Sequence, residues 1–233
     1  MLRTVEGSFQ LYSNPAFQAI SGPAFGVLRT VGQKFKLRLP AFQAIAGTAF
    51  SALETIGGNF ELSSNSPQLQ GILGTAFAAL ETIGGYFWLG RNPQLVAITG
   101  PTFATLRTVG GTFTLTSNPQ LHSINGTAFA ALGSVGGSFR VDNNTQLHAI
   151  TGSTFGALET LPADLQVYNN RAMSEMTGFG NLTAIHGELR MNDLAPTFNR
   201  VSALRALECV GSVFFQGSNI QAPPRTSTLS PCA

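Results

Sequence analysis

Hydrophobic residues recur along the chain with a period of about 26 residues. The recurring phrase reads L-x-T-[VI]-G-G-x-F-x-L-x-x-N-P-x-L-x-x-I-x-G-x-x-F-x-x-L, and apolar residues return at the same places in successive copies. A fixed period of this length is typical of a solenoid, in which each repeat buries its apolar face against its neighbours. We therefore expect about nine stacked coils, whose fourth positions are Val5, Val31, Ile56, Ile83, Val109, Val135, Leu161, Ile185 and Val210.

The F-x-L segment of each repeat alternates apolar with variable residues, which predicts a short strand with one buried face. Because all these strands would run in the same direction, they are expected to form one parallel sheet along one side of the solenoid. The expected buried pairs are Phe9/Leu11, Phe35/Leu37, Phe60/Leu62, Phe87/Leu89, Phe113/Leu115, Phe139/Val141 and Leu165/Val167.

Glycine precedes most of these strands and asparagine follows them. A pair such as Gly84-Gly85 suits a corner that requires a positive φ or a close approach of two backbones. A buried asparagine at a fixed place can bond the turn amides of its own and the adjacent coil. Repeat 2 has Leu39-Pro40 instead, which predicts a looser turn there. The asparagines concerned are Asn14, Asn65, Asn92, Asn118, Asn144 and Asn170.

The opposite wall of each coil carries G-x-x-F-x-x-L, whose apolar spacing predicts one short helical or 3₁₀ turn. Its aromatic residues should stack into a column. We expect a single solenoid domain over residues 1–220, followed by a Pro/Ser/Thr-rich tail or linker at 221–233. The column would contain Phe25, Phe50, Phe77, Phe103, Phe129, Phe155 and Phe179.

Composition and charge restrict the classes of partner that the chain could bind. Charged residues make up only 10% of the chain, the net charge is +2, and no basic run suited to a phosphate backbone is present, so we expect no nucleic-acid partner. No apolar stretch reaches the roughly 18 residues of a membrane span, so membrane association would need segments outside this chain. The first repeat already begins at Leu2, which leaves no room for a signal peptide and predicts a truncated fragment.

Candidate chemistry is sparse. G-x-S-x-G, H-E-x-x-H and P-loop motifs are absent from the sequence, so we expect neither an enzyme nor a cofactor. His122 and His148 occupy equivalent places in adjacent repeats, but two imidazoles do not complete a zinc site, and no metal is expected. Cys209 and Cys232 could form one terminal disulfide or remain two free thiols.

The outward side of the F-x-L strands is the most plausible working surface, because its residues vary while the inward residues do not. Aromatic residues and arginine anchor interfaces most often. The alternative is an ordinary solvated sheet face. The middle outward position is expected to run from Gln10 through Trp88 to Phe215 in the last repeat. The candidate ligand-binding residues are Tyr12, Lys34, Lys36, Arg38, Glu61, Tyr86 and Trp88.

Two phrases carry a resemblance to a known family: LETIGGYFWLGRNPQLVAI at 80–98 and LRTVGGTFTLTSNPQLHSI at 106–124. They resemble the receptor L-domain branch of the leucine-rich-repeat proteins, found in insulin-type and epidermal-growth-factor-type receptors and related surface proteins. The resemblance extends over residues 2 to about 220. It implies a leucine-rich-repeat-like, right-handed β-solenoid at the cell surface or outside the cell, often disulfide-capped and glycosylated.

On this basis we expect an extracellular recognition module that binds a protein or glycan on the outer face of its sheet. The alternative is a structural or adhesive cell-surface or cell-wall protein without a specific soluble ligand, since a scaffold of this kind hosts many functions. Glycosylation, which the resemblance implies, has three candidate sequons, at Asn125, Asn143 and Asn181.

Overall fold

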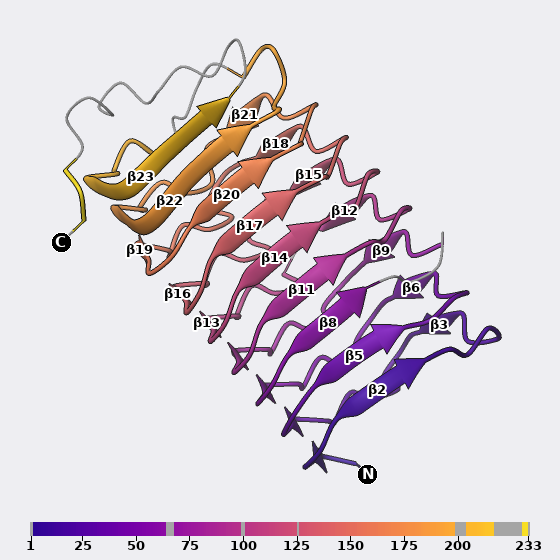
Figure 1. Ribbon diagram of the computed structural model, residues 1–233. Helices are drawn as coiled ribbons and strands as arrows, with labels where there is room; N and C mark the ends of the chain where they lie inside the picture. Colours follow the sequence, from indigo (N-terminus) through magenta and orange to yellow (C-terminus); the bar gives the residue numbers. More distant parts are fainter. Residues whose placement is uncertain are drawn as a thin grey trace.

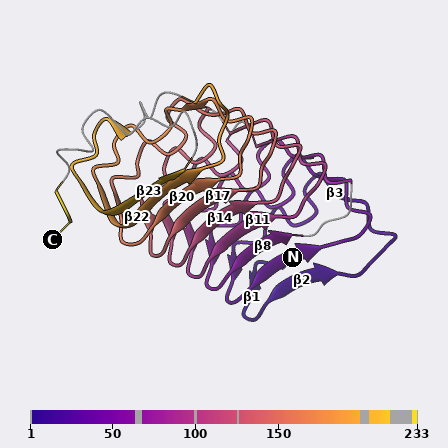
Figure 2. The ribbon, with the colours of Figure 1, turned by 45° about the horizontal axis from the view of Figure 1, so that its top comes forward.

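The computed structural model describes residues 2–63, 68–98, 101–124, 126–198, 204–216 and 230–232. Over these residues the chain is a parallel β-solenoid without an α-helix. Its coils lie side by side and advance along one axis, with the first coil at one end and the last at the other (Figure 1, Figure 2). The predicted stacking of sequence repeats into a solenoid is therefore confirmed.

The F-x-L segments form the longest sheet. In the described residues this sheet follows the order β19-β22-β20-β17-β14-β11-β8-β5-β2, with β23 added beside β22. Equivalent repeat positions face each other, as in the pairing of Phe87 with Phe113. Its strands are β2 (Phe9–Tyr12), β5 (Phe35–Arg38), β8 (Phe60–Ser63), β11 (Phe87–Gly90), β14 (Phe113–Thr116), β17 (Phe139–Asp142), β19 (Thr160–Leu161), β20 (Leu165–Tyr168), β22 (Ala184–Asn192) and β23 (Cys209–Gln216).

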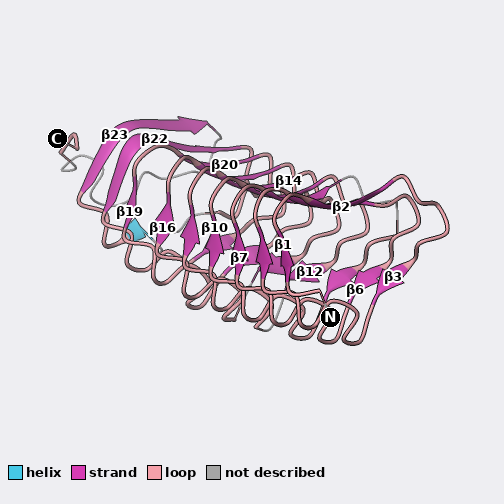
Figure 3. Cartoon of the chain, turned by 90° about the horizontal axis from the view of Figure 1, so that it is seen from below, coloured by secondary structure: helices cyan, strands magenta, loops and turns pink. Residues whose placement is uncertain are grey.

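Two further parallel sheets line the solenoid, so the expectation of a single sheet was wrong (Figure 3). Their strands contain only two residues each, which is too short for an alternating pattern to be recognised in the sequence. One sheet contains β1 (Thr4–Val5), β4 (Thr30–Val31), β7 (Thr55–Ile56), β10 (Thr82–Ile83), β13 (Thr108–Val109) and β16 (Ser134–Val135). The other contains β3 (Ala19–Ile20), β6 (Ala44–Ile45), β9 (Gly71–Ile72), β12 (Ala97–Ile98), β15 (Ser123–Ile124), β18 (Ala149–Ile150) and β21 (Glu175–Met176).

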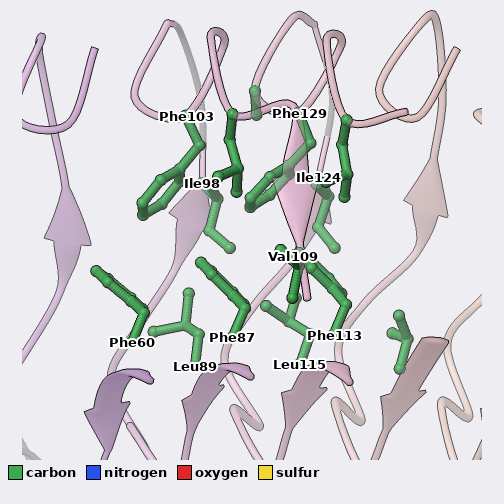
Figure 4. Close-up of a cluster of buried hydrophobic side chains, with 14 of the residues drawn as sticks. Phe60, Phe87, Leu89, Ile98, Phe103, Val109, Phe113, Leu115, Ile124 and Phe129 are labelled. Carbon is green, nitrogen blue, oxygen red and sulfur yellow. The ribbon is translucent and has the colours of Figure 1, made fainter. Parts of the chain in front are cut away.

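Two columns of phenylalanine rings fill the core. One column comes from the strands of the long sheet, where Phe87 stacks on Phe113 with ring centroids 4.7 Å apart. The other comes from the opposite wall, where Phe103 stacks on Phe129 at 5.2 Å. Rings of the two columns meet edge to face, the arrangement that aromatic quadrupoles favour, as for Phe87 and Phe103 (Figure 4). The predicted aromatic column is confirmed, and so are the buried strand pairs, except that Leu11 in the first coil is only partly buried.

The wall opposite the long sheet consists of consecutive hydrogen-bonded turns. In coil 3 the N–H of Ala78 donates to the carbonyl of Thr75, and that of Leu80 donates to the carbonyl of Phe77, both at 3.1 Å. These are the i+3 to i bonds of a 3₁₀ helix, but the segment 74–79 is a run of turns. Gly74 opens it with a φ of 74°, a conformation that favours glycine.

The Gly-Gly corners are explained by close backbone approach. A Cβ on Gly84 would lie 2.2 Å from the carbonyl oxygen of Gly57, and one on Gly110 would lie equally close to the carbonyl oxygen of Gly84. Neither glycine has a positive φ. A side chain at these corners would therefore push adjacent coils apart.

Asparagines form a ladder after the strands. Asn118 is fully buried, and its side-chain nitrogen donates to the carbonyl of Leu89 in the preceding coil at 3.2 Å. Its side-chain oxygen accepts the backbone N–H of Asn92 at 3.1 Å. Asn144 repeats both bonds one coil later, so the predicted role of these residues is confirmed. Asn65 lies outside the described residues.

The first two coils depart from this ladder. Asn14 is exposed and caps its own turn by accepting the N–H of Ala16 at 3.2 Å. In coil 2, Leu39 is buried, and its backbone carbonyl accepts the N–H of Phe42. The backbone carbonyl of Asn92 accepts the N–H of Leu95 in the same way. Leu39 thus keeps the turn geometry without the asparagine side chain.

At the C-terminal end, Cys209 in β23 is joined to Cys232 by a disulfide. Ser230 forms a parallel bridge with Cys209, and its carbonyl accepts the N–H of Val210 at 3.2 Å. Of the expected tail at 221–233, residues 230–232 therefore return to the last coil, and the rest lies outside the described residues.

Candidate functional site

The outer face of the long sheet presents one middle side chain from each strand, and these side chains stand side by side because the strands are in register. Glu61, Trp88 and Thr114 are consecutive members of this row. In the last coil Arg190 faces Phe214, so the expectation of Phe215 at this position was wrong. The bulge between Ile185 and Glu188 shifts the register before this point, and Phe215 packs toward the core instead.

Three of the predicted ligand-binding residues form an ion cluster on coils 2 and 3. The buried carboxylate of Glu61 lies 2.6 Å from Nζ of Lys36 and 3.4 Å from Nζ of Lys34, and it accepts the hydroxyl of Ser63 at 2.9 Å. Burial acts to raise the pKa of Glu61, but the hydrogen bonds from Lys36 and Ser63 and the two positive charges outweigh it and lower that pKa. The carboxylate is therefore fully paired within the cluster, which keeps one net positive charge.

A hollow of about 590 Å³ lies on the same face, over β14. Its floor consists of Thr114 and Thr116, the outward side chains of β14, and of Thr112, which directly precedes that strand. Large residues on the strands to either side bound it, Trp88 on β11 and Arg140 on β17. These two strands are two strand spacings apart, about 9.6 Å, so the hollow is a trough one strand wide.

The tryptophan lies across the neighbouring glycine. A Cβ on Gly90 would be 2.5 Å from Nε1 of Trp88. The indole can therefore lie against the strand because residue 90 has no side chain. Trp88 is consequently half-buried on the outward face. The guanidinium of Arg91 lies 5.8 Å from the centroid of the indole ring. The φ of Arg91 is 57°, in the left-handed region.

A fully buried carboxylate holds the opposite wall of the hollow. Asp142 accepts Nε of Arg140 at 2.6 Å and Nη2 of Arg140 at 3.1 Å, a two-point ion pair. It also accepts the hydroxyl of Thr116 at 3.0 Å and the side-chain nitrogen of Asn143. The hydrogen bond to Asp142 is the main reason that the pKa of Arg140 is raised. Both Arg140 and Thr116 are therefore fixed in orientation.

Beyond the hollow, arginines and aromatic rings alternate along the face. The guanidinium groups of Arg140 and Arg190 lie 5.1 and 5.2 Å from the ring centroid of Tyr168, and Arg190 also lies 5.0 Å from that of Phe214. Burial, followed by the charge of Asp142, raises the pKa of the Tyr168 hydroxyl. These cation–π contacts extend the rigid surface from coil 6 to coil 9.

The structure divides the predicted ligand-binding residues among three places. Tyr86 and Trp88 line the hollow, whereas Lys34, Lys36 and Glu61 form the ion cluster. Tyr12 and Arg38 are exposed and face each other across β2 and β5, away from the hollow. Residues of the hollow that the sequence reasoning did not select as ligand-binding are Arg91, Thr112, Thr114, Thr116, Ser117, Arg140, Asp142 and Asn143.

A signal for these residues was present in the aligned repeats. Only coil 5 carries threonine at all three of these positions, 112, 114 and 116, between a coil with Tyr86 and Trp88 and a coil with Arg140 and Asp142. Small side chains between large ones leave a depression in an otherwise even face. This depression becomes evident only when the outward residues of adjacent coils are compared position by position.

Two sequons are described, and they differ in exposure. Asn143 is half-buried at the hollow and accepts the side-chain nitrogen of Asn169 at 3.1 Å. Asn181 is exposed, and its side-chain nitrogen donates to the carbonyl of Gly156 at 2.7 Å. Asn125 lies outside the described residues.

His122 and His148 are stacked with ring centroids 6.0 Å apart. In the part of the chain that the structure describes, no three His, Cys, Asp or Glu side chains gather as a metal site would require. Nor does any helix among those residues have the length and apolar character to cross a membrane.

Comparison with known proteins gives no assignment. No protein-family model matches the chain. No curated protein matches it either.

Proposed function

We propose that the protein is a recognition module that binds an extracellular protein or glycan on the outer face of its long sheet. The observation that carries this proposal is the hollow over β14, where Tyr86 and Trp88 face the ion pair of Arg140 and Asp142 across a floor of threonines. Binding sites are concave and contain a few fixed polar groups beside aromatic surface. Catalysis has no comparable support, so we propose binding without reaction and without a cofactor.

The proposal includes the scaffold type and the location. A parallel solenoid with a C-terminal disulfide is compatible with a leucine-rich-repeat-like receptor L domain, and disulfides persist mainly in oxidising compartments. We propose a cell-surface or extracellular location on this basis. Nucleic acid is not a proposed partner, and attachment to a membrane would require segments outside this chain.

Arrays of extracellular proteins and glycans test the proposed function. The chain is applied to both arrays beside Thr114→Arg, which fills the hollow, and Gln10→Arg, which adds the same side chain at the matching position of β2. We expect binding by the original chain and by Gln10→Arg, and loss of binding by Thr114→Arg. Equal binding by all three, or no binding on either array, would overturn the proposal.

A structural or adhesive role is the second candidate. The continuous stacking favours it, because the aromatic columns run from coil to coil and the asparagine ladder joins Asn92 to Asn170, which should make the solenoid stiff. Absence of any array ligand, together with unfolding that remains cooperative along the whole length, would favour this role over recognition.

A further inference from the structure

We infer that the hollow over β14 binds an oligosaccharide that contains uronate, a sugar bearing a carboxylate. This inference rests on the proposed recognition function and specifies the class of ligand. Three features of the hollow carry it: a fixed aromatic surface, a floor of hydroxyl groups, and a positive charge at the surface that the ligand meets.

The aromatic surface is Trp88 on β11, with Tyr86 just before that strand. The indole is held against the strand by the missing side chain of Gly90. A flat and preorganised ring of this kind packs against the apolar C–H face of a pyranose with little loss of side-chain entropy. A single half-buried ring offers less to a protein partner, whose anchoring residues are typically enclosed in desolvated pockets.

The floor provides hydroxyl groups in a line. Thr114 and Thr116 project from alternate positions of β14, with Thr112 just before the strand, and each hydroxyl can both donate and accept. Thr116 already donates to Asp142, which leaves its oxygen as an acceptor. Sugar hydroxyls both donate and accept hydrogen bonds, so this floor suits them. Because the trough is one strand wide, it accommodates a single row of sugar rings along its length.

The charge that a ligand meets is positive. Asp142 has no exposed surface, and its oxygens already accept from Arg140, Thr116 and Asn143. Arg140 uses two of its five N–H groups in that pair and also hydrogen-bonds the hydroxyl of Tyr168, which leaves N–H groups on its outer edge. Arg91, at the other rim, takes part in none of the ion pairs found among the described residues. Two guanidinium groups are thus available to a carboxylate.

Calorimetric titration tests the inference with tetramers of galacturonate, guluronate and mannuronate and with hyaluronan tetramers. The matched neutral ligand is the methyl ester of the galacturonate tetramer, and tetraglutamate is the control for charge alone. We expect at least one uronate tetramer to bind about tenfold more tightly than neutral or peptide ligands. Trp88→Ala should weaken its binding about tenfold.

Arg91→Asn separates charge recognition from folding, because asparagine tolerates the positive φ at this position. We expect this variant to keep its thermal stability and to lose most of its preference for the acid over the ester. If array ligands bind through the hollow but no uronate tetramer does, or if tetraglutamate binds as tightly, the inference is overturned and the proposed function stands. If nothing binds through the hollow, both fail.

Discussion

The backbone N–H of Asn118 donates to the side-chain oxygen of Asn144 in the next coil at a distance of 3.0 Å. The equivalent bond from Asn92 to Asn118 measures 3.1 Å. Each asparagine therefore pairs a backbone group that its neighbour cannot satisfy, which is why the residue returns in most repeats. A buried group without a partner costs about 1–3 kcal/mol.

Asn118→Ala removes the side-chain bonds that Asn118 makes to the preceding coil and leaves its backbone bond to Asn144 in place. We expect the free energy of unfolding to fall by about 3 kcal/mol, because the N–H of Asn92 and the carbonyl of Leu89 both lose a partner. Urea denaturation followed by circular dichroism measures the change. Asn14→Ala is the control, since Asn14 has the same repeat position but is exposed, and its loss should be well under about 1 kcal/mol. Equal losses would contradict the ladder's role.

Gly90→Ala displaces the indole of Trp88, because the new Cβ would meet Nε1 at 2.5 Å. We expect the tryptophan emission to shift to longer wavelength as the ring moves into water, with a stability loss of about 1 kcal/mol. Since Trp88 is the sole tryptophan, the spectrum reports this site alone. Gly7→Ala, where a Cβ meets nothing within 4 Å, should leave the spectrum unchanged. An unaltered spectrum for Gly90→Ala would mean that the glycine does not position the ring.

Because of Glu61, the free energy of unfolding should depend on pH in the acid range. Its pKa is lower in the folded chain than in the unfolded chain, so its contribution is present above the unfolded pKa and is lost as the pH falls through the folded pKa. Glu61→Gln should cost about 1 kcal/mol near pH 7 and almost nothing near pH 2. Urea denaturation at both pH values gives the comparison.

Glu54→Gln serves as the control for Glu61, because Glu54 pairs with Arg29 at the exposed surface. Its effect should stay within about 0.5 kcal/mol. If Glu61→Gln costs the same at both pH values, the carboxylate charge is not what stabilises the cluster.

The disulfide fastens the segment at Ser230 to the last coil. Replacing both Cys209 and Cys232 with serine should lower the free energy of unfolding by about 3 kcal/mol, the value expected when a loop of this length is no longer closed in the unfolded chain. The reduced original chain should behave like the double variant in the same urea titration. A double variant as stable as the oxidised chain would contradict this account.

The sequence allowed the repeat, the long sheet and the core to be predicted, because these rest on periodic burial. Phe87 and Leu89 alternate with outward residues in a way that only a strand satisfies. The two smaller sheets could not be predicted, since a pair such as Thr82 and Ile83 is too short to show alternation. The turns of the opposite wall share their apolar spacing with a helix, so spacing alone does not separate them.

The candidate site was only partly predictable. The outward face and its aromatic residues follow from the alternation, which led to Tyr86 and Trp88. The partners on β14 and β17 were missed because a depression depends on side-chain size across adjacent coils. Lys34, Lys36 and Glu61 were selected by residue type, but register brings them close enough to pair with one another.

Trp88 fluorescence during titration with a ligand identified on the arrays is the most direct test of the claim that this face recognises a ligand. We predict a saturable change in emission and protection of the indole from acrylamide quenching, both reaching half-maximum at the dissociation constant measured by calorimetry. Thr114→Arg should abolish both effects. Saturable calorimetric binding without any change in Trp88 emission or quenching would contradict the account, because the ligand would then occupy another surface.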